Sequence, residues 1–252
     1  MDILTSQQIS DLKKCGKILR LALNDVMGSI KPGVSAFELN KIAEQTLKFH
    51  GAIPSFKNYL IPGVGRYPSS LCVSVNYEVV HGLPTKEKIL QDGDIVSLDL
   101  GAIYNGVCTD AAETVAVGNV EVETQALITA TKKSLAIGIG AIVEGSRIGD
   151  IGHAIQTYIE PLGYEVVRDL VGHGIGTKPH TDPQIPNYGN AKSGPVIKNH
   201  TALAIEPMVT MGSYEIYTDD DDWTIRTNDG SLAAHFEHTV VIIDHKPVIV
   251  TI

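Results

Sequence analysis

The first fifty residues carry apolar side chains at helical spacing, which predicts two helices separated by a break at Pro32-Gly33. The second helix should run from about Ser35 to Phe49. Glu38 follows Ser35 at the spacing of a capping box, in which both side chains satisfy free amides of the first turn. The apolar positions of the first helix are Ile9, Leu12, Cys15, Ile18, Leu19 and Ala22.

Parts of this pattern recur 112 positions further along the chain. Both segments are typical of a helix, a glycine break, a second helix, another glycine and then a β-like run. The recurrence predicts two related halves, each a helix pair with part of a sheet, packed into one body. The identities are few, so chance remains an alternative. The matched positions are Ile30 with Ile142, Gly33 with Gly145, Glu38 with Asp150, Leu39 with Ile151, and Gly51 with Gly163.

A β-hairpin is predicted around Asn105-Gly106, because Asn-Gly between two β-like runs is the strongest short hairpin signal. A two-residue turn places Asp99 opposite Ala112. Asp110 then lies on the same face as Asp99, as a diagonal neighbour with Cα atoms about 7–8 Å apart. Two carboxylates on one buried-looking face repel each other unless cations neutralise them. The hairpin therefore favours a metal site.

Three further candidate ligands lie in or beside other β-like runs. His173 follows the run 164–171 and is flanked by glycines that should leave its imidazole accessible. Glu206 and Glu237 are embedded in the apolar runs 202–209 and 236–243 and each needs a partner. Ion pairs with arginine are the alternative to a metal, and Arg168 and Arg226 are the arginines near these segments.

Four carboxylates and one imidazole suit a pair of divalent ions better than a structural zinc, which usually takes thiolate and histidine ligands. The set indicates a metal-dependent enzyme. His235 and His238 do not match the spacing of a zinc-protease helix, and on a strand they point to opposite faces. We therefore expect neither to be a ligand. The three cysteines are widely spaced and should be free, buried thiols.

Composition narrows the class of protein without naming it. The 252 residues are enough for one large domain or two small ones, with 43% hydrophobic and 19% charged residues. A net charge of −9 argues against a surface that coats nucleic acid. The start of the chain lacks a signal-peptide pattern, and the most apolar stretch, 135–143, is too short to span a bilayer. We expect a cytoplasmic protein without membrane or nucleic-acid partners.

Several motifs, in order along nearly the whole chain, resemble those of the type I methionine aminopeptidases of metallopeptidase family M24. They are Asn76-x-x-x-x-His81-Gly82-Leu83-Pro84, Asp99, Asp110-Ala111-Ala112-x-Thr114, Gly172-His173-Gly174-Ile175-Gly176, Ile205-Glu206-Pro207-Met208 and Phe236-Glu237-His238-Thr239. The resemblance implies an α+β fold of the pita-bread type, a pseudo-twofold, curved antiparallel sheet backed by helices. It also implies a single catalytic domain over 1–252, without an N-terminal extension domain.

The resemblance assigns roles that spacing alone does not. It implies two divalent ions, drawn from Co, Mn, Fe or Zn, bridged by Asp110 and Glu237. Asp99 completes one ion site, and His173 and Glu206 complete the other. By similarity, His81 and His180 contact substrate around the scissile amide, and Glu206 moves the proton to the leaving amine. The implied side-chain pocket is lined by Tyr67, Cys72 and Trp223.

The family resemblance implies removal of the initiator methionine from nascent proteins, preferentially before a small second residue, by a monomer in reach of the ribosome. Two alternatives stay open: an X-Pro-directed hydrolase of the same fold, whose relatives usually carry an N-terminal domain, and a non-catalytic binding module, which would be expected to have lost ligands. Two positions depart from the family pattern. Pro179 stands where relatives often carry a bulky apolar residue, and the loop 59–66 is longer or altered.

Overall fold

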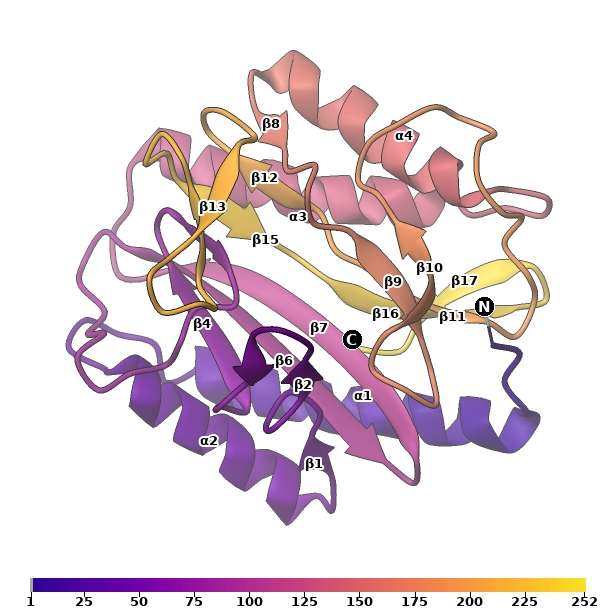
Figure 1. Ribbon diagram of the computed structural model, residues 1–252, viewed down its shortest axis with the longest axis horizontal. Coiled ribbons are helices and arrows are strands. Elements are labelled where there is room, and N and C mark those ends of the chain that lie inside the picture. Colours follow the sequence, from indigo (N-terminus) through magenta and orange to yellow (C-terminus); the bar gives the residue numbers. More distant parts are fainter. Residues whose placement is uncertain (1) are drawn as a thin grey trace.

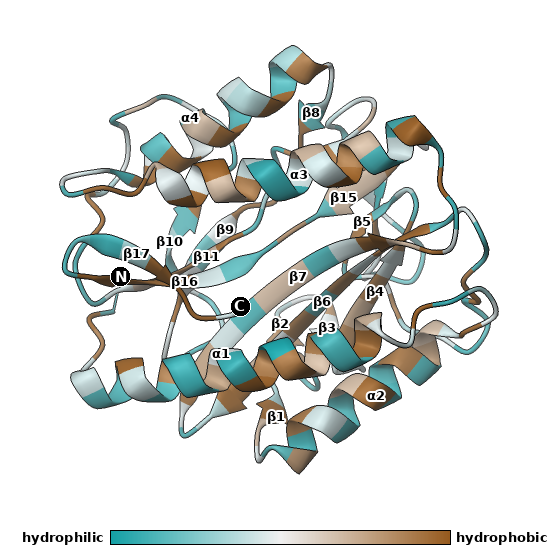
Figure 2. Ribbon diagram, turned by 180° about the vertical axis from the view of Figure 1, so that it is seen from behind, coloured by the Kyte–Doolittle hydropathy of each residue, from teal (hydrophilic) through white to brown (hydrophobic). Residues whose placement is uncertain are grey.

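The computed structural model describes residues 2–252. Two pairs of helices back a set of curved antiparallel sheets, with one pair behind each half (Figures 1 and 2). The first pair is α1 (Ser6–Met27) and α2 (Ala36–Phe49), and the second is α3 (Val122–Gly140) and α4 (Ile148–Ile159), which a 3₁₀ turn η1 (Glu160–Leu162) extends. Ser35 caps α2 as predicted. No helix within 2–252 is long and apolar enough to cross a membrane.

The longest strands form the sheet of the first half. β6 (Ile95–Tyr104) pairs along one edge with β7 (Val107–Ala116) and along the other with β4 (Leu71–Val75) and β1 (Ile53–Pro54). The short β2 (Leu60–Ile61) and β3 (Gly65–Arg66) make a separate hairpin. The predicted register of the long hairpin is confirmed, with Asp99 opposite Ala112. Both turn residues, Asn105 and Gly106, have positive φ, as a two-residue turn of this type requires.

The second half contains the largest sheet. Its order is β10 (Thr181–Ile185), β9 (Gly172–Ile175), β11 (Ala202–Ile205), β16 (His238–Ile243) and β17 (Lys246–Ile249). Two three-stranded sheets complete the fold. One is β15 (Ala233–His235), β12 (Met208–Thr210) and β8 (Glu165–Val166); the other is β13 (Ile216–Thr218), β14 (Ile225–Thr227) and β5 (Glu78–Val80).

The internal repeat is confirmed by equivalent local structure in the two halves. Gly33 and Gly145 both adopt the left-handed conformation, with φ of 91° and 81°. Glu38 and Asp150 each accept a hydrogen bond from the backbone N–H three residues earlier, at 3.0 and 2.7 Å. Left-handed backbone favours glycine, and a side-chain oxygen three residues after the N-cap can accept a hydrogen bond from the N-cap backbone N–H. The matched residues therefore mark the entry to the second helix of each pair.

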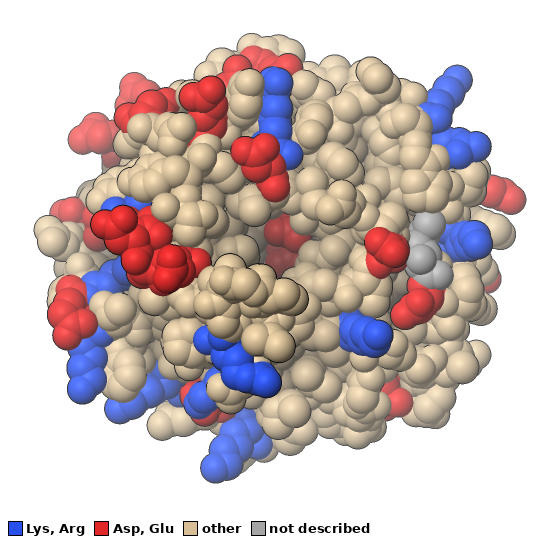
Figure 3. All heavy atoms as spheres, viewed as in Figure 1, with Lys and Arg blue, Asp and Glu red and all other residues tan. Residues whose placement is uncertain are grey.

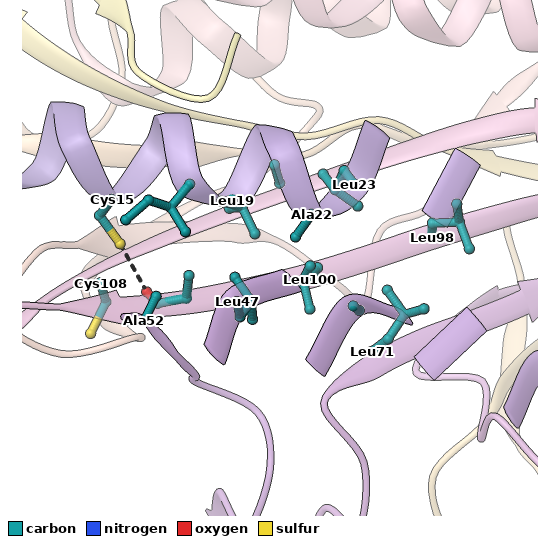
Figure 4. Packing of buried hydrophobic residues seen from close by; sticks show 14 of the residues in the cluster. Cys15, Leu19, Ala22, Leu23, Leu47, Ala52, Leu71, Leu98, Leu100 and Cys108 are labelled. Carbon is teal, nitrogen blue, oxygen red and sulfur yellow. Dashed lines mark hydrogen bonds between the residues drawn. The ribbon is translucent and has the colours of Figure 1, made fainter. Parts of the chain in front are cut away.

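Each half has its own apolar cluster between helices and sheet. In the first, Leu19 and Leu23 of α1 pack over Leu98 and Leu100 of β6, all fully buried (Figure 4). The second joins α3 and α4 to β11 and β16. The three cysteines are free and buried, as predicted, and Cys15 donates a hydrogen bond to the Ala102 carbonyl at 3.4 Å. These two packed layers hold the concave faces of the sheets in fixed positions.

Candidate active site

The predicted ligands and pocket residues meet in one cavity of about 200 Å³ between the two halves. Figure 3 shows a hollow on this face with acidic atoms at its floor. An apolar cavity of ~150 Å³ already holds a benzene molecule, so this one has room for a side chain and adjoining backbone but not for a folded segment. The ten predicted residues that line it are Asp99, Asp110, His173, Glu206, Glu237, His81, His180, Tyr67, Cys72 and Trp223.

The β6–β7 hairpin supplies the two aspartates. Asp99 stands opposite Cys72 of β4 on one side and Ala112 of β7 on the other. Asp110 lies two residues before Ala112 in β7. Both side chains are buried, with 8% and 3% of their surface exposed. Backbone hydrogen bonds on both sides of β6 hold this pair at the centre of its sheet.

The two glutamates lie at matched breaks in neighbouring strands, a feature that the sequence did not predict. The apolar runs 202–209 and 236–243 were expected to be continuous strands, and that expectation is wrong. β11 ends before Glu206 and β12 begins after Pro207, while β15 and β16 flank Glu237. The register is the same on both sides of the gap, so Glu206 and Glu237 face each other across it. Pro207 lacks an N–H, which helps to open the ladder.

The break at Glu237 ties the second half to the first. The backbone N–H of Glu237 donates to the Ala112 carbonyl at 2.9 Å, and the Ala112 N–H donates back at 3.3 Å. Beside this pair, Asp110 N–H donates to the Thr239 hydroxyl, which donates to the Asp110 carbonyl, both at 2.8 Å. These bonds bring carboxylates that are more than a hundred residues apart in sequence to adjacent positions.

His173 reaches the site differently from the sequence prediction. The run 164–171 is not one strand, because β8 ends at Val166, and His173 lies inside β9. Its flanking glycines are required for strand packing. A Cβ at Gly172 would come within 2.4 Å of the Ala204 carbonyl oxygen, and one at Gly174 would be equally close to that of Asp182. The glycines were expected to leave the imidazole accessible. In this packed strand it is mostly buried instead, with 13% of its side chain exposed.

The candidate ligand atoms form overlapping groups. Within each group the atoms lie within 4.8 Å of one another, and Asp110, His173 and Glu237 each belong to two groups. His173 donates from Nδ1 to the Gly174 carbonyl at 3.0 Å, which leaves Nε2 with a free lone pair facing the carboxylates. The groups are Asp99, Asp110 and Glu237; His173, Glu206 and Glu237; and Asp110, His173 and His180.

Arginine pairing, the alternative to a metal, is wrong for these acids. Arg168 pairs with Glu160 and Glu165, and Arg226 pairs with Glu78 and Asp219. No lysine or arginine of residues 2–252 forms an ion pair with the four site carboxylates. Asp99 Oδ1 and Glu237 Oε1 also lack any hydrogen-bond partner in that part of the chain. Buried oxygens without a partner are costly, so this donor set fits divalent cations.

Burial raises the pKa of all four carboxyl groups. The pKa of Asp99 rises to about 7 and that of Glu206 to about 8, while those of Asp110 and Glu237 lie well above their ordinary range, with neighbouring carboxylates adding to the effect. Burial lowers the pKa of His173 to about 3, so its imidazole is neutral at pH 7 and able to act as a ligand.

His81 and His180 both line the cavity. His81 has a φ of 59°, an unusual backbone conformation for a residue other than glycine and one that often occurs at functional sites. Burial lowers the pKa of His81 to about 4. His180 lies at the exposed rim, where its Nδ1 is 2.9 Å from the Tyr59 hydroxyl and its ring centroid is 4.3 Å from that of His173.

The predicted pocket residues form an apolar wall. The rings of Tyr67 and Trp223 meet edge to face with centroids 5.2 Å apart, and the Tyr67 hydroxyl donates to the Gly82 carbonyl at 3.2 Å. Cys72 is buried beside them. The sequence did not predict Phe56, Leu170 and Met208, which also line the cavity. In the sequence these three residues look like ordinary core residues, and only their position in the folded protein shows that they line the cavity.

The two segments expected to depart from the family pattern both lie beside the cavity. The 59–66 loop forms the β2–β3 hairpin, from which Tyr59 and Ile61 line the cavity. Pro179 is half-buried and directly precedes His180 at the rim. Neither Pro179 nor any residue of the loop 59–66 belongs to a ligand group.

His235 was not expected to be a ligand, and the sequence did not place it beside the candidate site. It is separated from His238 by the strand break, so each faces a different environment: His238 Nδ1 bonds to the Thr251 hydroxyl at 2.9 Å, outside the cavity. His235 is 1% exposed, and its Nε2 lies 3.5 Å from Glu206 Oε2. In the sequence, the only indication that His235 lies near the site is its position two residues before the candidate ligand Glu237.

Comparison with known proteins agrees with this geometry. The model of metallopeptidase family M24 matches residues 10–244. The chain is 48% identical to methionine aminopeptidase of Clostridium acetobutylicum, over 97% of this chain and 96% of the relative. It is 45% identical to methionine aminopeptidase 1 of Bacillus subtilis, with 95% and 94% covered.

Solved structures give the same result. The structure of methionine aminopeptidase from Thermotoga maritima superimposes with a TM-score of 0.96 at 43% identity, covering 100% of this chain and 99% of that one. Prolidase from Pyrococcus furiosus shares the fold, with a TM-score of 0.78 at 21% identity, but this chain covers 65% of its length. The expected pita-bread fold is thereby confirmed, and the chain belongs to metallopeptidase family M24, among its methionine aminopeptidases.

Proposed function

We propose that this protein removes the N-terminal methionine from nascent proteins and peptides by metal-dependent hydrolysis of the first peptide bond, preferentially when the second residue is small. The observation that carries the proposal is the cluster of four buried carboxylates and one imidazole, without cationic partners among residues 2–252, on the floor of an apolar-walled cavity. The close relatives of matching length carry the name of this activity.

Two divalent ions would be held by the five ligands. Asp110 and Glu237 would bridge them, because each is a carboxylate with two oxygens and belongs to two ligand groups, whereas His173, which also belongs to two groups, has only Nε2 free. Asp99 would complete one site, and His173 with Glu206 the other. Ions in such a pair supply a nucleophile from water at neutral pH and stabilise negative charge on the carbonyl oxygen.

The protein's own residues would position the substrate and move protons. Glu206 is the candidate to carry the proton to the leaving amine, because its carboxyl lies inside the cavity and does not pair with lysine or arginine in the described chain. His180 would donate from Nε2 toward the developing oxyanion, since its Nδ1 faces Tyr59. His81, neutral at pH 7, would hydrogen-bond to the peptide group beside the scissile bond.

The wall made by Tyr67, Cys72 and Trp223 would accept the methionine side chain. A thioether packs well against ring edges, and the Tyr67 and Trp223 rings present both edge and face to this space. A cavity of about 200 Å³ leaves little room beyond the first residue, which is consistent with a preference for a small second one. Acting on nascent chains would place the enzyme in the cytoplasm, near the ribosome, as a monomer and a single catalytic unit.

A peptide assay tests the proposal. The purified protein is supplied in turn with Mn²⁺, Fe²⁺, Co²⁺ and Zn²⁺, with oxygen excluded, and given Met-Ala-Ser, Met-Leu-Ser and an X-Pro dipeptide. Release of methionine, faster from Met-Ala-Ser, is the expected result, and Glu237→Gln should abolish it. Cleavage of the X-Pro dipeptide alone would assign an X-Pro hydrolase. No turnover with any metal would leave a binding module.

A further inference from the structure

His235 is a buried histidine with no assigned role and an unusually well-fixed backbone. Its N–H donates to the Thr114 hydroxyl and its carbonyl accepts from the same hydroxyl, both at 2.8 Å. Thr114 is itself paired with Ser97 at 2.7 Å. The last residue of β15 is thus anchored to the neighbouring β7 and β6 strands, so its imidazole has a defined position relative to the carboxylates.

The imidazole faces Glu206, and Asp99 is a second charged neighbour, which offsets part of the lowering of the His235 pKa by burial. Nε2 lies 3.5 Å from Glu206 Oε2, and neither ring nitrogen has a hydrogen-bond partner within residues 2–252. An unpaired buried donor costs about 1–3 kcal/mol, so a histidine in this place requires a compensating interaction. A neutral imidazole carries its proton on one of the two ring nitrogens, and Nε2 is the nitrogen of His235 from which a proton can be donated to Glu206 Oε2.

Glu206 lies between two histidines, one on each carboxyl oxygen. His173 Nε2 is 3.5 Å from Oε1, and His235 Nε2 is the same distance from Oε2. His173 uses its Nδ1 proton on the Gly174 carbonyl, so its Nε2 is the ligand nitrogen. The two imidazoles therefore have different capacities: one offers a lone pair beside Oε1, and the other can offer a proton to Oε2.

Two other roles for His235 do not fit its surroundings. It belongs to none of the groups of ligand atoms within 4.8 Å of one another in residues 2–252, which argues against a sixth ligand. It is also not among the residues that line the cavity, which argues against contact with the substrate. Glu206, whose Oε2 lies 3.5 Å from Nε2 of His235, lines the cavity and belongs to a ligand group.

We propose that His235 is a positioning residue whose Nε2–H donates to Glu206 Oε2 and orients Oε1 toward the side on which His173 and Glu206 would together hold an ion. A 3.5 Å separation is longer than the ~2.7–3.2 Å of a formed bond, and rotation about the last bond of the Glu206 side chain, which has a broad preference, closes it. The inference rests on the proposed function and extends it to the residue that sets the orientation of the proton-carrying carboxylate.

The test compares His235→Gln, His235→Asn and His235→Leu. Glutamine can place its amide N–H₂ where Nε2 stands, asparagine is too short to reach, and leucine has no donor. Three quantities are measured for each: Mn²⁺ affinity by calorimetry, kcat and KM on Met-Ala-Ser, and the melting temperature in the presence of chelator. Supporting interactions of this kind typically contribute about 10–100-fold to metal affinity or activity.

We expect His235→Leu and His235→Asn to lose about 10–100-fold in Mn²⁺ affinity and kcat, with KM within about threefold of the original, and His235→Gln to stay within about fivefold. Equal loss in all three variants, or no loss in any, would overturn the proposal. If the leucine variant fails to fold, the contrast between glutamine and asparagine decides. Should the unmodified protein bind Mn²⁺ but release no methionine, the proposed function fails, while the affinity contrast still tests His235.

Discussion

Loading this site with metal should release protons, and the number follows from the buried carboxyl groups. With a pKa of about 7, Asp99 is about half protonated at pH 7, and Glu206, at about 8, is about nine-tenths protonated. Asp110 and Glu237, raised well above their ordinary range, add up to about one proton each. His173, with a pKa of about 3, adds none. Because ligands must be ionised, binding should release between about 1.4 and 3.4 protons.

The sign of the pH dependence follows from the same pKa shifts. These acids hold protons in the folded, chelator-treated protein that an exposed acid would have lost, so metal and protons compete for the site. Metal binding should strengthen as pH rises through 7 and 8 and weaken as it falls. A release of about 1.4 protons corresponds to an affinity that increases ~25-fold per pH unit at pH 7, and the increase becomes smaller toward pH 8 as these acids lose their protons.

Calorimetry measures this release directly. Mn²⁺ is titrated into chelator-treated, dialysed protein at pH 7 in two buffers that differ in heat of ionisation, and the difference in observed heat gives the proton count. Glu206→Gln is the matched variant, because it removes the carboxyl group expected to release about nine-tenths of a proton while keeping its shape. No proton release, or the same release from Glu206→Gln, would refute the reasoning.

Four substitutions probe other parts of the account. Asp110→Asn should abolish turnover, because it removes a negative charge shared by both ions; near-normal kcat would count against a bridging role. His180→Ala should lower kcat by about 10²–10³-fold with Mn²⁺ content unchanged, and parallel loss of both would indicate a structural role. Leu19→Ala should cost about 2–5 kcal/mol in urea unfolding, since Leu19 is fully buried. Gly172→Ala should lower the melting temperature and metal affinity together, because its Cβ meets the Ala204 carbonyl oxygen; an unchanged melting curve would contradict the close strand packing.

The features that sequence predicted well are set by local chemistry. Asn105-Gly106 determines a two-residue turn, and the turn determines which residues oppose each other along β6 and β7. The hydrogen bonds that Glu38 and Asp150 accept from the backbone N–H three residues earlier are local too. A turn or a cap that a few neighbouring residues determine can be predicted without knowledge of the rest of the fold.

The strand breaks depend on partners that lie far away in sequence. Apolar runs around Glu206 and Glu237 have the composition of continuous strands, and the interruption follows from pairing of Glu237 with Ala112 in the other half. The same applies to His235, whose significance depends on Glu206 lying across the gap. Residue spacing cannot reveal which long-range pairings a chain selects, so the site residues identified by resemblance needed the structure to explain their arrangement.

The central claim is that five side chains from both halves hold two ions on the cavity floor. Anomalous diffraction from crystals grown with Mn²⁺ tests it most directly. We predict two peaks about 3.5–4 Å apart, both in contact with Asp110 and Glu237, with Asp99 on one and His173 with Glu206 on the other. A single peak, or peaks away from these residues, would contradict the account.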